Sequence, residues 1–180
     1  MRQNWVMWSG ALNEVQISMI LKEAEKIEIE RATTNDESNT DQVRKSDVGW
    51  LDVPEIQNLL WEYVRAANYN ALRVFVENIA PLQYTEYKAE QGGHYDWHVD
   101  VDWNEESWFD RKLSVTVQLS DPSEYSGGEF QFKETENPDE SCKAKGTVLV
   151  FPSYLLHRVT PVTSGTRKSL VAWFEGPRWQ

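Results

Sequence analysis

Hydrophobic residues follow a helical spacing in the first part of the chain and a strand-like spacing in the rest. Over 12–32, apolar residues recur every three or four positions among many charges, which predicts an amphipathic helix with Asn13 as its N-cap. A polar, turn-rich loop is expected at 33–47 and a short extended piece at 48–53. A second helix is predicted over 54–72, because the proline at its start suits a first helical turn.

Short β-type runs separated by Gly, Pro and Asp turns fill the remainder of the chain. They lie at 73–79, 82–89, 94–101, 112–120, 127–132, 146–152, 157–162 and 169–174. Many short strands at such spacing are typical of an antiparallel sandwich or barrel. We therefore predict a mainly β fold with flanking helices, a small jelly roll packed on two N-terminal helices. The whole chain, 1–180, is expected to form one domain, with a helical support at 1–71 and a jelly-roll core at 72–180.

Composition narrows the classes of partner. The formal net charge is −11, so the surface repels phosphate backbones, and nucleic acid is a poor candidate for a partner. No apolar run reaches the roughly 20 residues of a membrane span, and the first residues lack the apolar segment of a signal peptide. The single cysteine, Cys142, fits a reducing compartment. We expect a cytoplasmic protein, in the cytoplasm of the host cell if a phage encodes it, and these features leave the oligomeric state unknown.

The stretch HYDWHVDVDW contains the His-x-Asp spacing twice, as His94 with Asp96 and as His98 with Asp100. Two residues at this spacing point to the same side of a strand. His157, far along the chain, could add a second imidazole. Two histidines and one carboxylate form the facial triad that binds Fe(II) and leaves positions open for O₂ and a co-substrate. The alternative is a solvated edge strand, since carboxylates commonly cover such a face.

Arg167 follows His157 by ten positions and begins an apolar strand. An arginine in an apolar interior needs an anionic partner, because an unpaired buried charge is costly. A dicarboxylate that chelates the iron at one end and meets Arg167 at the other would be such a partner. The alternative is an arginine exposed in the turn SGTRK.

Together these residues resemble a known family. The pattern Tyr87…Gly93-x-Tyr95-x-x-His98-x-Asp100, followed by LSVTVQLSDPSEYSGGEFQF and FPSYLLHRVTPVTSGTRKSLVAWF, is similar to the Fe(II)/2-oxoglutarate dioxygenases of the prolyl 4-hydroxylase type. It is most like their bacterial and phage branch, which includes the PKHD-type hydroxylases. The likeness runs from about residue 83 to 174. It implies a double-stranded β-helix (a jelly roll) that uses Fe(II), 2-oxoglutarate and O₂, with ascorbate as a candidate reductant.

The resemblance also implies which residues form the site. The family has an aromatic residue three positions before its first metal ligand, and Tyr95 stands there relative to His98. The implied ligands are therefore His98, Asp100 and His157, with His94 as second choice. Arg167 would bind the distal carboxylate of 2-oxoglutarate.

A tyrosine before the metal motif usually assists this arginine, and Tyr87 matches it best. The Tyr87–His98 stretch is longer than usual, so Tyr84 is the alternative. The resemblance implies that Tyr95 and three further residues line the pocket: Leu113, Leu119 and Trp173.

The implied reaction is hydroxylation of an aliphatic C–H, with a prolyl residue of a peptide or protein as the favoured substrate. The loop at 102–112, with Trp103 and Trp108, is a candidate lid or substrate edge; otherwise its tryptophans pack on neighbouring strands. Two other functions stay open. One is hydroxylation of a free amino acid or another small molecule, and the other is a non-catalytic jelly roll that only binds a metal.

Overall fold

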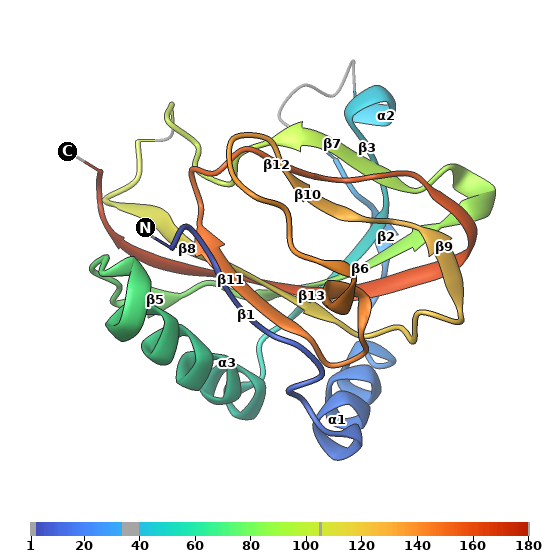
Figure 1. The fold of residues 1–180 in the computed structure, drawn as a ribbon, viewed down its shortest axis with the longest axis horizontal. Coiled ribbons are helices and arrows are strands. Elements are labelled where there is room, and N and C mark those ends of the chain that lie inside the picture. Colours follow the sequence, from blue (N-terminus) through green and yellow to red (C-terminus); the bar gives the residue numbers. More distant parts are fainter. Residues whose placement is uncertain (1–2, 34–39, 105, 180) are drawn as a thin grey trace.

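The computed structural model describes residues 3–33, 40–104 and 106–179. Two β-sheets face one another, and two longer helices lie beneath one of them (Figure 1). Within the described residues, no helix combines the length and the apolar character that crossing a membrane requires.

The helices and strands are mostly short. The α-helices are α1 (Glu14–Ala24), α2 (Thr40–Val43) and α3 (Pro54–Ala67), and a π-helical turn, Asn68–Leu72, continues α3. The 3₁₀ turns are Ala89–Gln91 and Glu140–Lys143. The strands are β1 (Val6–Trp8), β2 (Glu30–Arg31), β3 (Arg44–Lys45), β4 (Asp47–Leu51), β5 (Asn78–Ile79), β6 (Leu82–Lys88), β7 (His94–His98), β8 (Phe109–Gln118), β9 (Tyr125–Gly127), β10 (Phe130–Phe132), β11 (Val148–Pro152), β12 (His157–Val159) and β13 (Val162–Pro177).

The larger sheet has the order β1-β11-β8-β13-β6-β4-β2, with β5 and β9 also paired to β13. The smaller sheet has the order β10-β12-β7-β3. Among the described residues, neighbouring strands pair in antiparallel fashion throughout both sheets. The predicted jelly roll on two helices is therefore confirmed.

The first helix begins as its sequence predicts but ends early. The side chain of Asn13 accepts a hydrogen bond from the backbone N–H of Gln16, and the Gln16 side chain accepts one from the backbone N–H of Asn13, which completes a capping box. The helix ends at Ala24 rather than near residue 32, since turn residues follow it and strand β2 begins at Glu30.

The predicted strand at 73–79 is mostly wrong, since only β5 at its end is a strand. Arg73 adopts the left-handed conformation, with φ 53°. The side chain of Asn68 then accepts from the N–H of Val74 and donates to the carbonyl of the same residue, both at 2.7 Å. These local bonds replace the pairing that a strand would need.

The segment expected as a loop before residue 48 contains helix α2 and strand β3, while residues 34–39 lie outside the described part of the chain. The extended piece that follows is present as β4. Strand β3 pairs with β7, so it extends the smaller sheet beside the candidate metal ligands.

The main core lies between the larger sheet and the two long helices. Along β8, alternate residues Leu113, Val115 and Val117 join the same buried cluster as Ile20 and Leu60 of the helices. Because successive side chains on a strand point to opposite faces, the intervening polar residues of β8 point into the space between the two sheets.

Candidate metal centre and its cavities

Strand pairing brings two distant histidines together. In the antiparallel pair of β7 and β12, His98 lies directly opposite His157. Their ring centroids are 4.2 Å apart. The sequence predicts that both can be ligands, and the register between the two strands makes them neighbours.

Asp100 lies just beyond the end of β7. Its backbone N–H donates to the carbonyl of Ser153 at 2.9 Å, which holds the chain beside the two histidines. Its carboxylate oxygens lie 3.7 Å from His98 Nε2 and 3.7 Å from His157 Nε2. One donor atom of each of the three side chains lies within 4.8 Å of the others.

Backbone carbonyls orient both imidazoles. Nδ1 of His98 contacts the carbonyl of Asp96 at 2.7 Å, and Nδ1 of His157 contacts that of Leu155 at 2.8 Å. A carbonyl can only accept, so Nδ1 carries the hydrogen in each ring and Nε2 of a neutral ring keeps its lone pair. Burial, together with the neighbouring His157, lowers the pKa of His98, which favours the neutral ring.

The carboxylate of Asp100 is stabilised in its charged form. Burial by itself would raise the pKa of Asp100, but the two histidines and Ser114 outweigh that effect and lower it. Ser114 Oγ donates to Asp100 Oδ2 at 2.6 Å and also contacts Ser153 Oγ at 2.9 Å. The sequence interpretation missed Ser114, although polar residues at alternate positions of an apolar strand indicate a second, polar face.

Two imidazole nitrogens and one carboxylate oxygen on one side of a cavity are the donor set of a 2-His-1-carboxylate iron site. The three side chains therefore fit an Fe(II) ion. His94 is not part of the cluster, because its two ring nitrogens face the backbone carbonyls of Gly92 and Gln42 at 2.8 and 3.1 Å.

Tyr95 supports the first ligand from the side. Its ring stacks on that of His98 with centroids 3.4 Å apart and planes 8° from parallel. The guanidinium of Arg44 lies over the Tyr95 ring, 4.5 Å from the centroid. Arg44 is buried and also donates to Ser46 and Gln83 at 2.8 Å. Tyr95 therefore lines the cavity, as expected, and also fixes the plane of an imidazole.

A cavity of about 40 Å³ adjoins the three candidate ligands, and Arg167 lies in its wall. Arg167 is only 4% exposed. Among the described residues, no carboxylate lies within ion-pairing distance of its guanidinium. The alternative of an arginine exposed in the turn SGTRK is therefore wrong. Arg167 is a buried cation that faces a cavity, without an anionic partner among the described residues.

The two tyrosines considered as partners of Arg167 occupy different places. Tyr87 lies opposite Arg167 in the pairing of β6 with β13 and lines the cavity. The guanidinium lies 5.4 Å from the centroid of the Tyr87 ring. Tyr84 belongs to the main core, and its hydroxyl donates to Glu86 at 2.9 Å.

Trp173 lines the cavity, whereas Leu113 and Leu119, expected as pocket walls, lie in the main core. For Leu113 the alternation along β8 explains this correction, since it turns Leu113 toward the helices and Thr116, three positions further on, toward the cavity. Nε1 of Trp173 is the buried side-chain polar atom that finds no hydrogen-bond partner among the described residues.

The outer side of Trp173 contacts two further residues. The guanidinium of Arg111 lies over the Trp173 ring at 3.8 Å and also donates to the carbonyl of Asp100 at 3.4 Å. Trp50, which is 51% exposed, lies near Trp173, with 6.1 Å between the two ring centroids.

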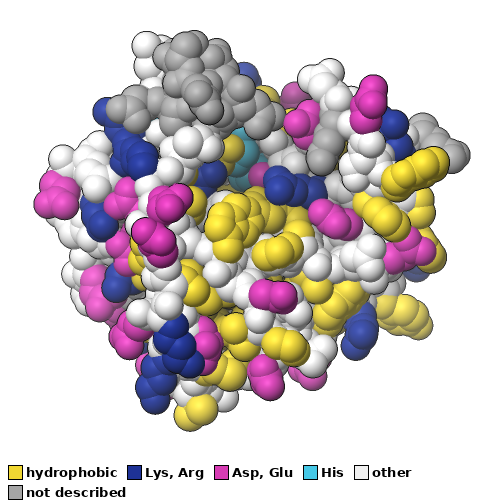
Figure 2. Space-filling model, turned by 180° about the vertical axis from the view of Figure 1, so that it is seen from behind, with side chains coloured by type: hydrophobic (Ala, Val, Ile, Leu, Met, Phe, Trp, Pro, Cys, Tyr) yellow, Lys and Arg dark blue, Asp and Glu magenta, His cyan; other side chains and the backbone are white. Residues whose placement is uncertain are grey.

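Figure 2 shows a histidine reaching one face of the molecule, with hydrophobic and basic side chains around it.

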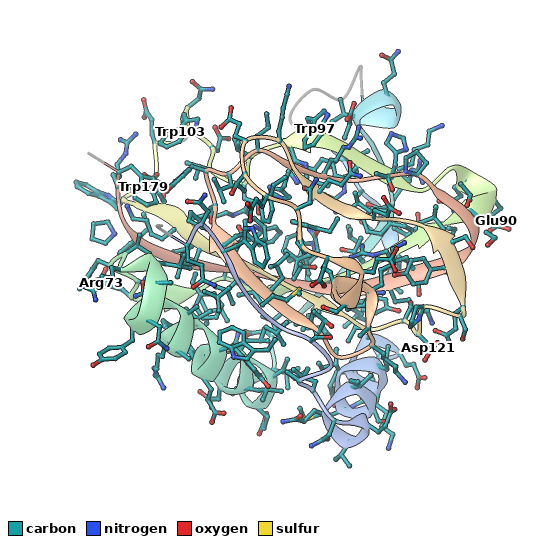
Figure 3. All side chains as sticks on the ribbon, viewed as in Figure 1. Arg73, Glu90, Trp97, Trp103, Asp121 and Trp179 are labelled. Carbon is teal, nitrogen blue, oxygen red and sulfur yellow. The ribbon has the colours of Figure 1, made fainter. Side chains whose placement is uncertain are left out.

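The loop after Asp100 presents its tryptophans to solvent. Trp103 is 56% exposed and Trp108 is 88% exposed. Figure 3 shows Trp103 at the periphery, on the same side of the molecule as Trp179. The idea that these side chains pack on neighbouring strands is therefore wrong, and their role toward a substrate stays a prediction.

Comparison with a family model gives a match to the 2OG-Fe(II) oxygenase superfamily over residues 82–175. This range contains all three candidate ligands and Arg167. A PKHD-type hydroxylase of Aliarcobacter butzleri is 38% identical over 92 residues, which are 49% of this chain and 41% of that protein. A PKHD-type hydroxylase of Nitrosomonas europaea is 34% identical over 136 residues, 72% of this chain and 57% of that protein. The matches thus cover about half the length of these relatives.

Solved structures show the same fold at lower sequence identity. The viral collagen prolyl hydroxylase of Paramecium Bursaria Chlorella virus-1 superposes with a TM-score of 0.71 at 21% identity, covering 97% of each chain. A prolyl-4-hydroxylase of Pseudomonas putida gives a TM-score of 0.71 at 21% identity, covering 97% of this chain and 93% of that one.

Proposed function

The chain belongs to the 2OG-Fe(II) oxygenase superfamily, and we propose that it hydroxylates an aliphatic C–H of a peptide, with a prolyl residue as the favoured target. We further propose that residues 1–180 act as a single oxygenase domain. The observation that carries the reaction class is the convergence of His98, Asp100 and His157 beside a cavity in which the buried Arg167 has no carboxylate partner.

Each of these residues has a defined task in the proposed reaction. His98 and His157 would bind Fe(II) through Nε2, and Asp100 would bind it through its carboxylate. Bound iron would supply the oxidising chemistry, in which O₂, 2-oxoglutarate and the substrate C–H are converted to succinate, CO₂ and the C–OH product. Arg167 would bind the distal carboxylate of 2-oxoglutarate. This contact would orient the 2-oxo end of the same molecule toward the three metal ligands.

The apolar walls of the cavity would keep water away from the reacting atoms. Phe130, Phe151 and Val159 line it together with the ligands. Exclusion of water limits unproductive oxidation and strengthens the hydrogen bonds and charges within the site. The chain itself thus contributes orientation, charge and a dry space.

A peptide substrate is supported by the groups around Trp173. Trp173 lines the cavity and carries an unpartnered indole N–H, and the Arg111 guanidinium lies over its ring at 3.8 Å; a peptide carbonyl is a suitable acceptor for either donor. The exposed ring of Trp50 next to Trp173 offers a flat apolar surface of the kind that a proline ring packs on. Two of the solved structures with this fold are those of prolyl hydroxylases.

The test is release of CO₂ from labelled 2-oxoglutarate by the Fe(II)-loaded protein, combined with mass spectrometry of a proline-containing peptide library. We expect a mass gain of one oxygen in a peptide. Asp100→Ala and His157→Ala should abolish CO₂ release, and Arg167→Ala should mainly raise the concentration of 2-oxoglutarate required. Arg158→Ala is the matched control, because Arg158 neighbours His157 but bonds to Gln131 outside the cavity.

Other outcomes would identify the competing functions. Stimulation of CO₂ release by free amino acids but not by peptides would indicate a small-molecule hydroxylase. Metal binding without any consumption of O₂ or 2-oxoglutarate would contradict the oxygenase proposal and favour a metal-binding module.

A further inference from the structure

A groove of about 530 Å³ lies beside the cavity at the candidate metal centre, where β4 and β2 form the edge of the larger sheet. Val48 and Trp50 of β4 line it, and it shares Arg44 and Gln83 with the cavity. Arg44 Nη2 donates to Gln83 Oε1 at 2.8 Å, so this hydrogen-bonded pair forms the wall between the two spaces.

A row of paired residues leads across the larger sheet from the cavity to the groove. Thr116 of β8 pairs with Val171 of β13, Val171 pairs with Gln83 of β6, and Gln83 pairs with Trp50 of β4. The first three line the cavity, and the last two line the groove. Directly paired residues present their side chains on the same face of a sheet. The groove therefore continues the surface on which a substrate in the cavity would lie.

The cavity itself has little room for a peptide. One water needs about 10–15 Å³ of such space, so about 40 Å³ corresponds to roughly three waters. The residues on either side of a target side chain must therefore lie outside the cavity. The unpartnered N–H of Trp173 and the neighbouring ring of Trp50 lie on the way to the groove.

Two glutamates give the groove negative groups that a ligand can reach. Glu28 and Glu30 line the groove and are exposed, and neither forms an ion pair with a described residue. Glu30 pairs with Val48, which places both side chains on the same face of the sheet. A Cβ at Gly49 would lie 2.9 Å from the carbonyl oxygen of Glu28, so glycine allows this acidic segment to approach β4 closely.

Two arginines also line the groove, but other groups hold them. Arg31 Nη1 lies 3.7 Å from Asp47 Oδ1 and donates to Gln91 Oε1 at 2.7 Å. Arg31 follows Glu30 on the strand, so the two side chains leave it on opposite faces. Arg44 is buried and belongs to the wall shared with the cavity. The groove therefore offers a cationic ligand two carboxylates, while both arginines are already bound to the protein.

We infer that this groove binds the part of the peptide substrate next to the target residue and selects a lysine or an arginine there. The aliphatic stem of that residue packs along Val48 beside Trp50, and its charged end meets Glu28 and Glu30. Figure 2 shows acidic side chains next to hydrophobic ones on the face that the histidine reaches. The net charge of −11 also favours the encounter with a basic peptide. This inference rests on the proposed function and adds the chemical class of its substrate.

Strand spacing gives the position of the basic residue. Neighbouring strands lie about 4.8 Å apart, and an extended chain advances about 3.3 Å per residue. The two strand steps from Val171 in the cavity to Trp50 in the groove therefore correspond to about three residues of peptide. We expect the lysine or arginine about three positions from the hydroxylated residue.

The test uses short synthetic peptides with one central proline, in which lysine, glutamine or glutamate is placed in turn at every other position. Hydroxylation by the Fe(II)-loaded protein with 2-oxoglutarate and O₂ is measured by mass spectrometry as kcat/KM. Lysine about three positions from the proline should raise kcat/KM about three- to tenfold over glutamine, and glutamate should lower it.

Variants of the glutamates separate recognition from a structural effect. In Glu28→Gln/Glu30→Gln the preference for lysine over glutamine should fall below about twofold. In Glu30→Lys the preference should reverse, so that glutamate is favoured at the same peptide position. A general loss of structure would lower kcat/KM for all peptides alike and could not reverse the order. Glu62→Lys is the matched control, because it changes the net charge equally from helix α3, beneath the other face of the sheet, and should keep the preference for lysine.

Failure of the inference is separable from failure of the proposed function. If no peptide is hydroxylated, the peptide part of the proposed function is wrong, and the inference fails with it. If peptides are hydroxylated but lysine gives no advantage at any position, or keeps its advantage in Glu30→Lys, the inference alone is wrong. Should Glu30→Lys not fold, Glu28→Gln/Glu30→Gln carries the test, and an unchanged preference for lysine in that variant overturns the inference.

Discussion

Removal of the Ser114 hydroxyl should weaken metal binding without removing a ligand. The hydroxyl donates to Asp100 Oδ2 at 2.6 Å, a short distance typical of a hydrogen bond to a charged oxygen. Such a bond is worth about 1.5–3 kcal/mol. If it is needed to orient the carboxylate toward the ion, its loss corresponds to a metal affinity about ten- to a hundredfold lower, because about 1.4 kcal/mol is a factor of ten.

The assay is titration of the metal-free protein with Fe(II) under anaerobic conditions, for the wild type, Ser114→Ala and a control. Ser120→Ala is the control, because Ser120 is equally buried and its Oγ accepts from the N–H of Lys168 at 2.7 Å, away from the ligands. Wild-type affinity in Ser114→Ala would refute the reasoning. Equal losses in both variants would show that the effect is one of general stability.

Two further predictions concern the stability of the fold. Asn13→Ala should lower the free energy of unfolding by about 1 kcal/mol, measured by urea denaturation, because it removes the N-cap of α1; an unchanged midpoint would contradict that role. Burial would raise the pKa of Asp47, but its hydrogen bonds with Lys88 and Gln91 hold the pKa below 3.8. A carboxyl with a lowered pKa stabilises the folded state above its unfolded pKa, and this stabilisation is lost as the pH falls through the folded value. Urea denaturation between pH 6 and pH 2 should therefore show a smaller acid-induced loss in Asp47→Asn than in the wild type, and equal losses would contradict the prediction.

Much of the fold and several candidate ligands could be predicted from the sequence, because local patterns carry them. Helical spacing and a cap residue at Asn13 locate the start of α1, and turn residues separate the strands of the jelly roll. The side chains of His98, Asp100 and His157 are metal-binding groups, and their types alone indicate which donor atoms an ion would meet. Where local signals compete, prediction fails, as at Arg73, whose left-handed backbone ends a run that reads as a strand.

The tertiary structure decides which side chains meet. No local pattern sets the register that places His157 opposite His98, since that depends on the pairing of strands distant in the chain. Likewise, the alternation along β8 becomes informative only once the helices are known to cover one of its faces. Because the helices bury one face of β8, Leu113 lies in the core, while Ser114 on the opposite face contacts Asp100. Residue types therefore determine what chemistry is available, and packing determines which residues can take part in it.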